Sequence, residues 1–319
     1  MISARALEAI ESSDTDDLLL VIDGLCSAQD WDDLVELRAR CREAVERGKQ
    51  VWGAEEHIRY RLTLEAPPAY AGPAVSEGQS RFALGPLAEV AASTKTWIEM
   101  EPYLELGPER RTLAAERVIR GERVDEPNLE LPGSLQSWEP RYPVATYKRD
   151  KVETPSPPPP ELTEADLPTK FETVDDPQSE AALADLVQPW TDESNGRCQT
   201  MAVAGDHLAA IRALGATVCR HAAIGAPTGL AWMGWAAASG GAHGRRRGAA
   251  AGRHLAWWAT AVMADLVWPC LPAELGSAAS RFDWFWFDDG SPGTGWALRL
   301  AIEDHEGGLS WAISAVDLA

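Results

Sequence analysis

Hydrophobic residues in the first 66 positions recur three and four residues apart, which is the spacing of one face of a helix. Leu34, Leu37, Cys41 and Val45 are the clearest series. The same spacing returns at 52–65, 86–92, 96–104 and 108–123. We therefore predict an acidic, all-helical first domain over residues 1–149, built from helical hairpins in a solenoid-like arrangement.

Prolines change the pattern near the end of this region, at Pro127, Pro132, Pro140 and Pro143. Proline lacks a backbone N–H and disfavours the helical conformation of the residue before it. We therefore expect residues 127–149 to form an extended tail that packs on the helices.

The second half of the chain has short apolar runs bounded by turn residues, which are typical of strands. We expect an α+β domain over 181–319, with helices covering a mixed or antiparallel sheet of about five strands that ends in a β-meander. The expected strands are 198–204, 216–224, 282–287, 296–302 and 309–316, and the expected helices are 207–214, 227–239 and 245–266.

A proline-rich segment separates the two halves. The stretch from Thr154 to Pro160 has five prolines in seven residues, and acidic residues continue to Glu180. Such a composition favours extended polyproline II structure, so we predict a linker over residues 150–180. A proline run can also bind a groove lined by aromatic residues, and this alternative stays open.

The net charge of the protein limits the classes of molecule that it can bind. The 319 residues include 49 Asp plus Glu and 29 Lys plus Arg, giving a formal net charge of −20. A protein this acidic is repelled overall by nucleic acid and by anionic lipid. The exception is the window 201–253, in which six arginines stand against one acid, Asp206. Nucleic-acid binding through this window is the weaker alternative, and we expect no membrane partner.

Cysteine usage and the N-terminus indicate the compartment. The five cysteines form no CxxC pair, and an odd number cannot all be bridged internally. The first residues lack the long apolar stretch of a secretory signal. The most apolar run, 255–268, is shorter than the ~20 residues that a bilayer requires. Together these features predict a cytoplasmic protein with reduced thiols.

One short segment resembles a known repeat. Residues 28–37, Ala-Gln-Asp-Trp-Asp-Asp-Leu-Val-Glu-Leu, are similar to the turn between the paired helices of tetratricopeptide-type repeats. The similarity covers one helical hairpin, and no second copy follows at the fixed period of a repeat array. It supports a helical-hairpin organisation for the first domain.

A wider resemblance lies in the second half, from about residue 205 to 268 and in the meander. It rests on Gly240-Gly-Ala-His-Gly-Arg-Arg-Arg-Gly-Ala-Ala-Ala-Gly-Arg253, on the pair Trp257-Trp258 and on Gly295-Trp296-Ala-Leu-Arg-Leu-Ala301. These residues resemble an uncharacterised family of proteins from high-GC bacteria. The family has no assigned activity, so the resemblance implies no catalytic residue.

The glycine- and arginine-rich segment 240–254 is the main candidate for a binding site. A glycine loop before a helix start that carries three arginines would surround an anion, such as a phosphate, with N–H donors. The candidate anion-binding residues are Arg245, Arg246, Arg247, Gly241, Gly244 and His243. Three cations at a helix start are unfavourable without a negative charge, which acids of this protein could also supply. The segment lacks the GK[ST] of a P-loop, and the chain has no GxGxxG.

The same glycines have a structural interpretation. Gly240, Gly244, Gly248 and Gly252 recur every four residues, so on a helix they would form a ridge of small side chains. Such a ridge lets another backbone approach closely. Several of these glycines could equally lie in a loop before the helix.

Histidines and cysteines offer a second candidate site. Cys219 and His221 are two residues apart, so a strand would place both on one face. Their spacing matches no zinc pattern, and we expect no metal and no cofactor. In a strand, Cys219 is more typical of a buried apolar residue. His221, His243 and His254 are the candidate acid–base groups of an enzymatic second domain.

The chain contains 14 tryptophans, and aromatic residues are densest at 282–287. Alternation makes this strand apolar on both faces, which predicts an internal strand covered on each side. If the tryptophan face were exposed, it could stack bases or a sugar ring.

These observations favour a non-enzymatic protein-interaction or scaffold protein, in which the acidic helical domain binds a protein partner. The first alternative is a second domain that binds a small anionic ligand or is an enzyme, using the segment 240–254. The sequence assigns no catalytic residue.

Overall fold

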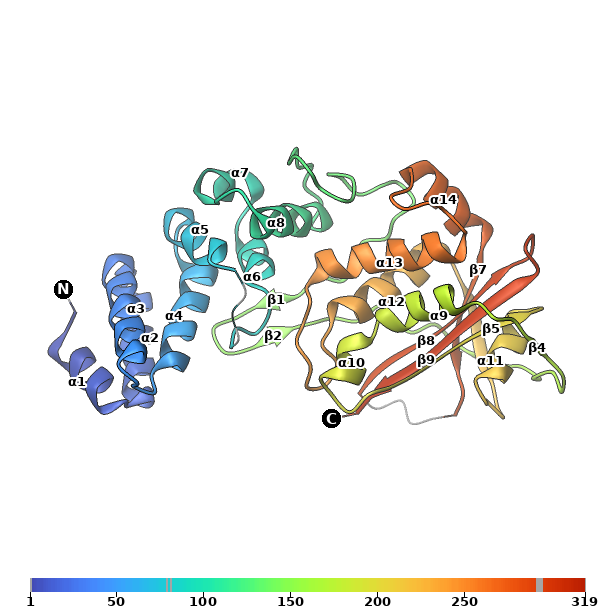
Figure 1. Ribbon diagram of the computed structural model, residues 1–319, viewed down its shortest axis with the longest axis horizontal. Helices are drawn as coiled ribbons and strands as arrows, with labels where there is room; N and C mark the ends of the chain where they lie inside the picture. Colours follow the sequence, from blue (N-terminus) through green and yellow to red (C-terminus); the bar gives the residue numbers. More distant parts are fainter. Residues whose placement is uncertain (1, 79, 81, 291–294, 319) are drawn as a thin grey trace. The chain divides into compact units, whose positions relative to one another are not determined.

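The computed structural model describes residues 2–78, 80, 82–290 and 295–318. Contacts divide the chain into two compact units, both shown in Figure 1. Unit 1 holds the described residues up to Asn128 together with Ala145–Glu153. Unit 2 holds Leu129–Val144 and the described residues from Thr154 onward. Independent folding of 1–149 and 181–319 stays a prediction.

Unit 1 is helical, as the sequence predicts, with one two-stranded hairpin. At the start of α2, the Asp14 side chain accepts a hydrogen bond from the backbone N–H of Asp17, and Gln29 ends that helix in the left-handed conformation. Such caps satisfy backbone groups that the helix itself leaves unpaired. The elements are α1 (Ala4–Ser12), α2 (Thr15–Ala28), α3 (Trp31–Glu46), α4 (Trp52–Glu65), α5 (Pro68–Ser76), α6 (Leu87–Thr94), α7 (Trp97–Met100), the 3-10 helix η1 (Glu101–Tyr103), α8 (Pro108–Ile119), β1 (Thr146–Tyr147) and β2 (Val152–Glu153).

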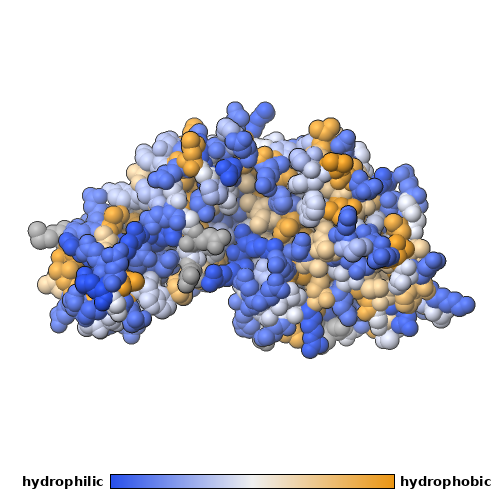
Figure 2. Space-filling model, viewed as in Figure 1, coloured by the Kyte–Doolittle hydropathy of each residue, from blue (hydrophilic) through white to orange (hydrophobic). Residues whose placement is uncertain are grey.

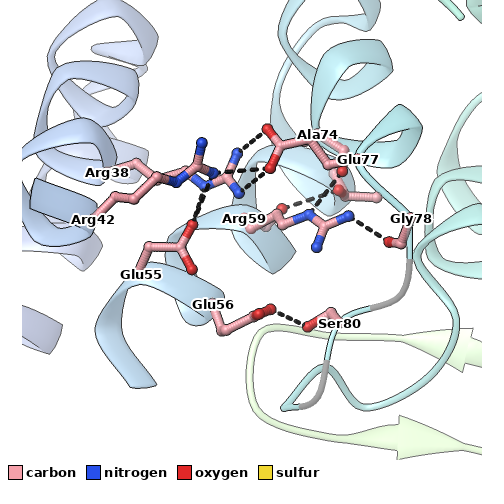
Figure 3. A network of polar contacts seen from close by, with 10 residues as sticks. Arg38, Arg42, Glu55, Glu56, Arg59, Ala74, Glu77, Gly78 and Ser80 are labelled. Carbon is pink, nitrogen blue, oxygen red and sulfur yellow. Dashed lines mark hydrogen bonds and ion pairs between the residues drawn. The ribbon is translucent and has the colours of Figure 1, made fainter. Parts of the chain in front are cut away.

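A largely buried guanidinium joins three parts of unit 1 (Figure 3). Arg38 of α3 donates to Glu55 of α4 over 2.8 Å and to both carboxylate oxygens of Glu77 over 2.7 Å each. Arg42 donates to Glu77 over 2.8 Å. Paired Arg–carboxylate hydrogen bonds fix orientation as well as distance. The network therefore holds α3, α4 and the end of α5 in register.

Unit 2 is organised around a seven-stranded antiparallel sheet of order β3-β6-β7-β8-β9-β5-β4. Its strands are β3 (Thr163–Glu164), β4 (Glu172–Thr173), β5 (Arg197–Ala204), β6 (Arg220–Ile224), β7 (Asp283–Asp288), β8 (Trp296–Asp304) and β9 (Leu309–Asp317). Its helices are α9 (Pro177–Asp185), α10 (Gln188–Asp192), α11 (His207–Ala213), α12 (Ala226–Ala238), α13 (Ala249–Met263) and α14 (Pro272–Arg281).

The α+β class and the closing β-meander of the second half are confirmed, because β7, β8 and β9 pair in succession. The sheet has two more strands than expected. Both β3 and β4 come from residues 150–180, which the sequence predicts to be a linker, and they form the two edges of the sheet. Two-residue strands carry too little hydrophobic alternation to be recognised in a sequence.

The two faces of the sheet differ because successive side chains on a strand point to opposite sides. Trp284, Trp286 and Trp311 belong to a core shared with α9, α12 and α13, which lie across this face in Figure 1. Phe287 and Ala301 point to the other face and pack with the short helix α11. The aromatic strand β7 is thus internal and covered on both sides, as the sequence predicts.

Helices α12 and α13 approach closely at a pair of glycines. A Cβ added to Gly252 would overlap the carbonyl oxygen of Gly234, so no larger residue fits there. This contact explains why position 252, one of the four glycines spaced four residues apart in 240–252, is occupied by glycine.

The expected start of the second long helix at Arg245 is wrong, because α13 begins at Ala249. The backbone N–H groups of Arg247 and Gly248 donate to the carbonyl oxygen of Ala238, the last residue of α12. Gly248 then enters the helix with φ +94°. The end of the loop between α12 and α13 is therefore hydrogen-bonded to the last residue of α12, and α13 begins only after this contact.

A fully buried carboxylate holds the segment Leu129–Val144 on α13. Glu139 accepts hydrogen bonds from Nε of Arg253 over 2.7 Å and from Nε1 of Trp257 over 2.8 Å. Nη1 of Arg253 donates to the carbonyl oxygen of Pro132 over 3.1 Å. The sequence predicts a tail packed on the first helices, but residues 129–144 lie in unit 2.

None of the helices in the described ranges is both long enough and apolar enough to cross a membrane.

Replacing Glu139 by Gln is expected to lower the free energy of unfolding by about 3–5 kcal/mol, because Arg253 would stay buried without its counter-charge. Urea denaturation of the full chain measures this loss. The control is Glu130→Gln, since Glu130 is 77% exposed where it pairs with His254. An exposed pair contributes at most about 1 kcal/mol. Equal, small losses in both variants would contradict the prediction.

Candidate functional site

The N-terminal end of α11 places a histidine against a buried carboxylate of the sheet. Asp206 caps α11 by accepting a hydrogen bond from the N–H of Ala209, so His207 is the first helical residue. The backbone N–H of His207 lies 3.1 Å from Oε2 of Glu303, and its Nδ1 lies 2.9 Å from the same oxygen. Two donors from one residue therefore fix both the backbone and the ring.

A second histidine continues the contact. Nε2 of His207 lies 3.0 Å from Nδ1 of His221 on β6. The ring of Phe285 on β7 lies parallel to that of His207, with centroids 3.4 Å apart and planes 5° apart. Glu303, His207 and His221 thus form a continuous chain of polar contacts, and the His207 ring is stacked on Phe285.

The hydrogen-bond partners determine which ring nitrogens carry protons in this chain of contacts, since an ionised carboxylate only accepts hydrogen bonds. We assign the Nδ1 proton to His207, which donates it to Glu303. Nε2 of the neutral His207 ring then accepts from Nδ1–H of His221. This arrangement leaves Nε2 of His221 as the basic end of the chain.

The side chains of the site become more exposed from Glu303 through His207 to His221. The side chain of Glu303 is 8% exposed and that of His207 is 12% exposed. His221 is partly exposed. Burial, followed by the neighbouring His207, lowers the pKa of His221 from its ordinary value. A neutral, partly exposed imidazole backed by a second histidine and a carboxylate can accept a proton.

Cys219 does not supply a nucleophile to this site. Burial, with smaller contributions from Asp288 and Asp289, raises the pKa of its thiol to about 11, so the thiol is protonated at neutral pH. It packs in the apolar core beneath α11. Within the described part of the chain, no three His, Cys, Asp or Glu residues are placed to hold a metal ion.

The candidate anion-binding loop already binds carboxylates of this protein. The backbone N–H of Ala242 donates to Asp317 over 2.6 Å, and that of Arg245 donates to Glu193 over 2.8 Å. Gly241 has φ +69°, and a Cβ there would overlap the Asp317 carboxylate. The loop fits carboxylates at close range, but binding of a separate anion stays untested.

The three arginines predicted for this site differ in exposure. Arg245 is exposed, whereas Arg246 and Arg247 are partly buried. Nη2 of Arg247 donates to the carbonyl oxygen of Asp185 over 2.8 Å, and burial lowers the pKa of Arg247. His243 is exposed and Gly244 is partly buried.

The rest of the basic window 201–253 also forms internal contacts. Arg212 donates to the carbonyl oxygen of Ala216 over 2.6 Å, and Arg220 pairs with Asp288. Arg253 is the buried partner of Glu139. Two of the six arginines, Arg220 and Arg253, are therefore paired with carboxylates of unit 2.

Of the residues that form the site, the sequence analysis gave His221 as one of three candidate acid–base groups and gave no such role to His207 or Glu303. His207 is 96 residues from Glu303 and 14 from His221. No fixed spacing links these positions. The one available signal is that His207 directly follows a good helix-capping residue, Asp206.

A model of a family of unknown function, DUF6183, matches residues 16–317 of the chain. The chain belongs to this family. The match spans both halves of the chain and agrees with the resemblance to an uncharacterised family seen in the sequence. No curated protein and no solved structure matches the chain.

We expect the imidazole of His221 to titrate below pH 6.5 in the native protein, because burial and His207 both disfavour its charged form. NMR detection of the ring nitrogens measures this value. In His207→Gln the pKa of His221 should rise without reaching 6.5, since burial remains.

The same shift affects stability, because unfolded His221 binds more protons than native His221 near and below pH 6.5. Wild-type protein should therefore lose stability relative to His221→Gln as the pH falls through 6.5. A native titration of His221 at or above 6.5 would contradict both expectations.

Proposed function

We propose that unit 2 is a catalytic module that performs general acid–base chemistry at His221. The observation that carries this proposal is the chain Glu303–His207–His221, whose buried end is a carboxylate and whose other end is a partly exposed imidazole. The proposal differs from the enzymatic alternative raised by the sequence, which used the segment 240–254, and shares with it His221 as a candidate acid–base group.

In the proposed step, Nε2 of His221 takes a proton from a substrate or from a water molecule. His221 then passes its Nδ1 proton to Nε2 of His207, which becomes an imidazolium. Glu303 stabilises this cation through the Nδ1–H hydrogen bond. Returning the proton along the same path completes general acid catalysis, so the site ends unchanged.

The surroundings support proton transfer rather than covalent catalysis by the protein. The nearby thiol of Cys219 is buried and protonated, so His221 would act on a water molecule or on an acidic C–H, N–H or O–H group of the substrate. Hydrolysis and proton abstraction are the reaction classes that fit.

A generic ester, 4-nitrophenyl acetate, tests the proposed chemistry in the full chain. We expect hydrolysis that requires neutral His221, with a midpoint below pH 6.5, and a fall of roughly 10²-fold in His221→Gln, as is usual when a general base is removed. His57→Gln is the matched control, because His57 is also partly buried with a lowered pKa but lies on α4 in unit 1. Equal rates in wild type and His221→Gln would refute the proposal.

The interaction function favoured by the sequence remains a second candidate, supported by apolar side chains exposed in unit 1. Ile98 on α7 is 79% exposed, Leu106 before α8 is 88% exposed, and Tyr103 on η1 is 47% exposed. Figure 2 shows hydrophobic atoms projecting from the surface over α7. Contiguous exposed apolar patches are a feature of protein-binding surfaces.

The double variant Ile98→Ser, Leu106→Ser should lose a protein partner that the wild-type chain retains in affinity capture, because apolar contact area is removed. Val267→Ser is the matched control, since Val267 is 86% exposed but lies in unit 2. A partner retained equally by all three proteins would contradict a role for this surface.

A phosphate-type ligand in the loop 240–248 is less well supported, because such a ligand would have to displace Glu193 and Asp317 from the loop amides. Nucleic-acid binding through 201–253 is weakened by the internal pairing of Arg220 and Arg253. The cytoplasmic location expected from the cysteines stays part of the proposal.

A further inference from the structure

A third histidine contacts the carboxylate that anchors the proposed site. His305 directly follows the last residue of β8, in the turn before β9. Its Nδ1 lies 2.8 Å from Oε1 of Glu303, and its Nε2 lies 2.6 Å from Oδ2 of Asp283. Asp283 stands directly opposite Glu303 in the pairing of β7 with β8. The two oxygens of Glu303 thus face two different histidines.

The contacts of His305 fit its protonated form. Each ring nitrogen faces a carboxylate oxygen, and ionised carboxylates only accept hydrogen bonds. An imidazolium satisfies both contacts by donating one N–H to each. The His305 side chain is 66% exposed, so the ring remains open to solvent while it holds the buried Glu303.

The other charged groups near this turn face different partners. Arg281 at the end of α14 pairs with Asp304 at 3.1 Å and with Glu306 at 3.8 Å. Asp206, next to His207 at the start of α11, accepts a hydrogen bond from the N–H of Ala209. The basic side chain that directly faces Glu303 from the turn is therefore His305.

We propose that His305 is a positioning residue that holds Oε1 of Glu303, directs Oε2 toward His207 and sets the pH at which the His207–His221 pair takes up a proton. This inference rests on the proposed acid–base function. A cation beside Glu303 offsets part of its negative charge and so weakens the pull of Glu303 on a proton at His207. Without that cation, the pair should become protonated at higher pH.

Ring-nitrogen NMR titrations of His207 and His221 in the full chain test the inference. In His305→Gln, a neutral side chain replaces the cation, and the midpoint should move upward by about half a unit or more. In His305→Lys, the positive charge is restored, and the midpoint should return toward the wild-type value. A purely structural role for His305 would not respond to the charge of its replacement.

Arg281→Gln is the matched control, because it removes a cation at the same turn that faces Asp304 and Glu306. We expect a smaller shift in this variant than in His305→Gln. An unchanged midpoint in His305→Gln, or equal midpoints in His305→Gln and His305→Lys, would overturn the inference.

The ester assay separates this inference from the proposed function. If His221→Gln keeps full hydrolysis while His305→Gln shifts the titration, the catalytic proposal fails and the role of His305 in proton affinity stands. If hydrolysis depends on His221 but the midpoint does not respond to His305, the catalytic proposal stands and the role of His305 fails.

Discussion

The buried pair Glu139–Arg253 links a segment distant in sequence to the helices that cover the sheet of unit 2. A charge removed from water requires a close counter-charge and further hydrogen bonds, and Trp257 supplies one of these to Glu139. The pair attaches an otherwise irregular, proline-containing segment to α13. That helix in turn packs on α12 through Gly252, and both cover the tryptophan-rich face of the sheet.

Covering one face with long helices leaves the opposite face to the short helix α11, and this difference creates the proposed site. The face under α11 combines an apolar core with Glu303, His207 and His221 beside it. Antiparallel register brings Asp283 opposite Glu303, and the turn after β8 adds His305. The acid–base groups of the site thus come from four segments, namely α11, β6, β7, and β8 with the turn that follows it. The pairing of the strands and the N-terminal end of α11 position these groups next to one another.

The basic window 201–253 forms several contacts within unit 2. A protein with a net charge of −20 has acids available for every arginine, and internal pairing requires no partner. Asp317 and Glu193 reach the backbone amides of the loop 240–248, while Glu139 reaches Arg253. The positive segment therefore contributes largely to the internal contacts of unit 2.

The sequence by itself determined the helical character of the first half, the meander and the internal aromatic strand, because these depend on periodicities of a few residues. It also gave His221, together with His243 and His254, as a candidate acid–base group. Only the tertiary structure decided that His207 and Glu303 meet His221, because contacts across 96 residues depend on strand order and register. Likewise, α13 begins later than expected because the residues before it are hydrogen-bonded to the end of α12. The helix preferences of neighbouring residues do not predict such a tertiary contact.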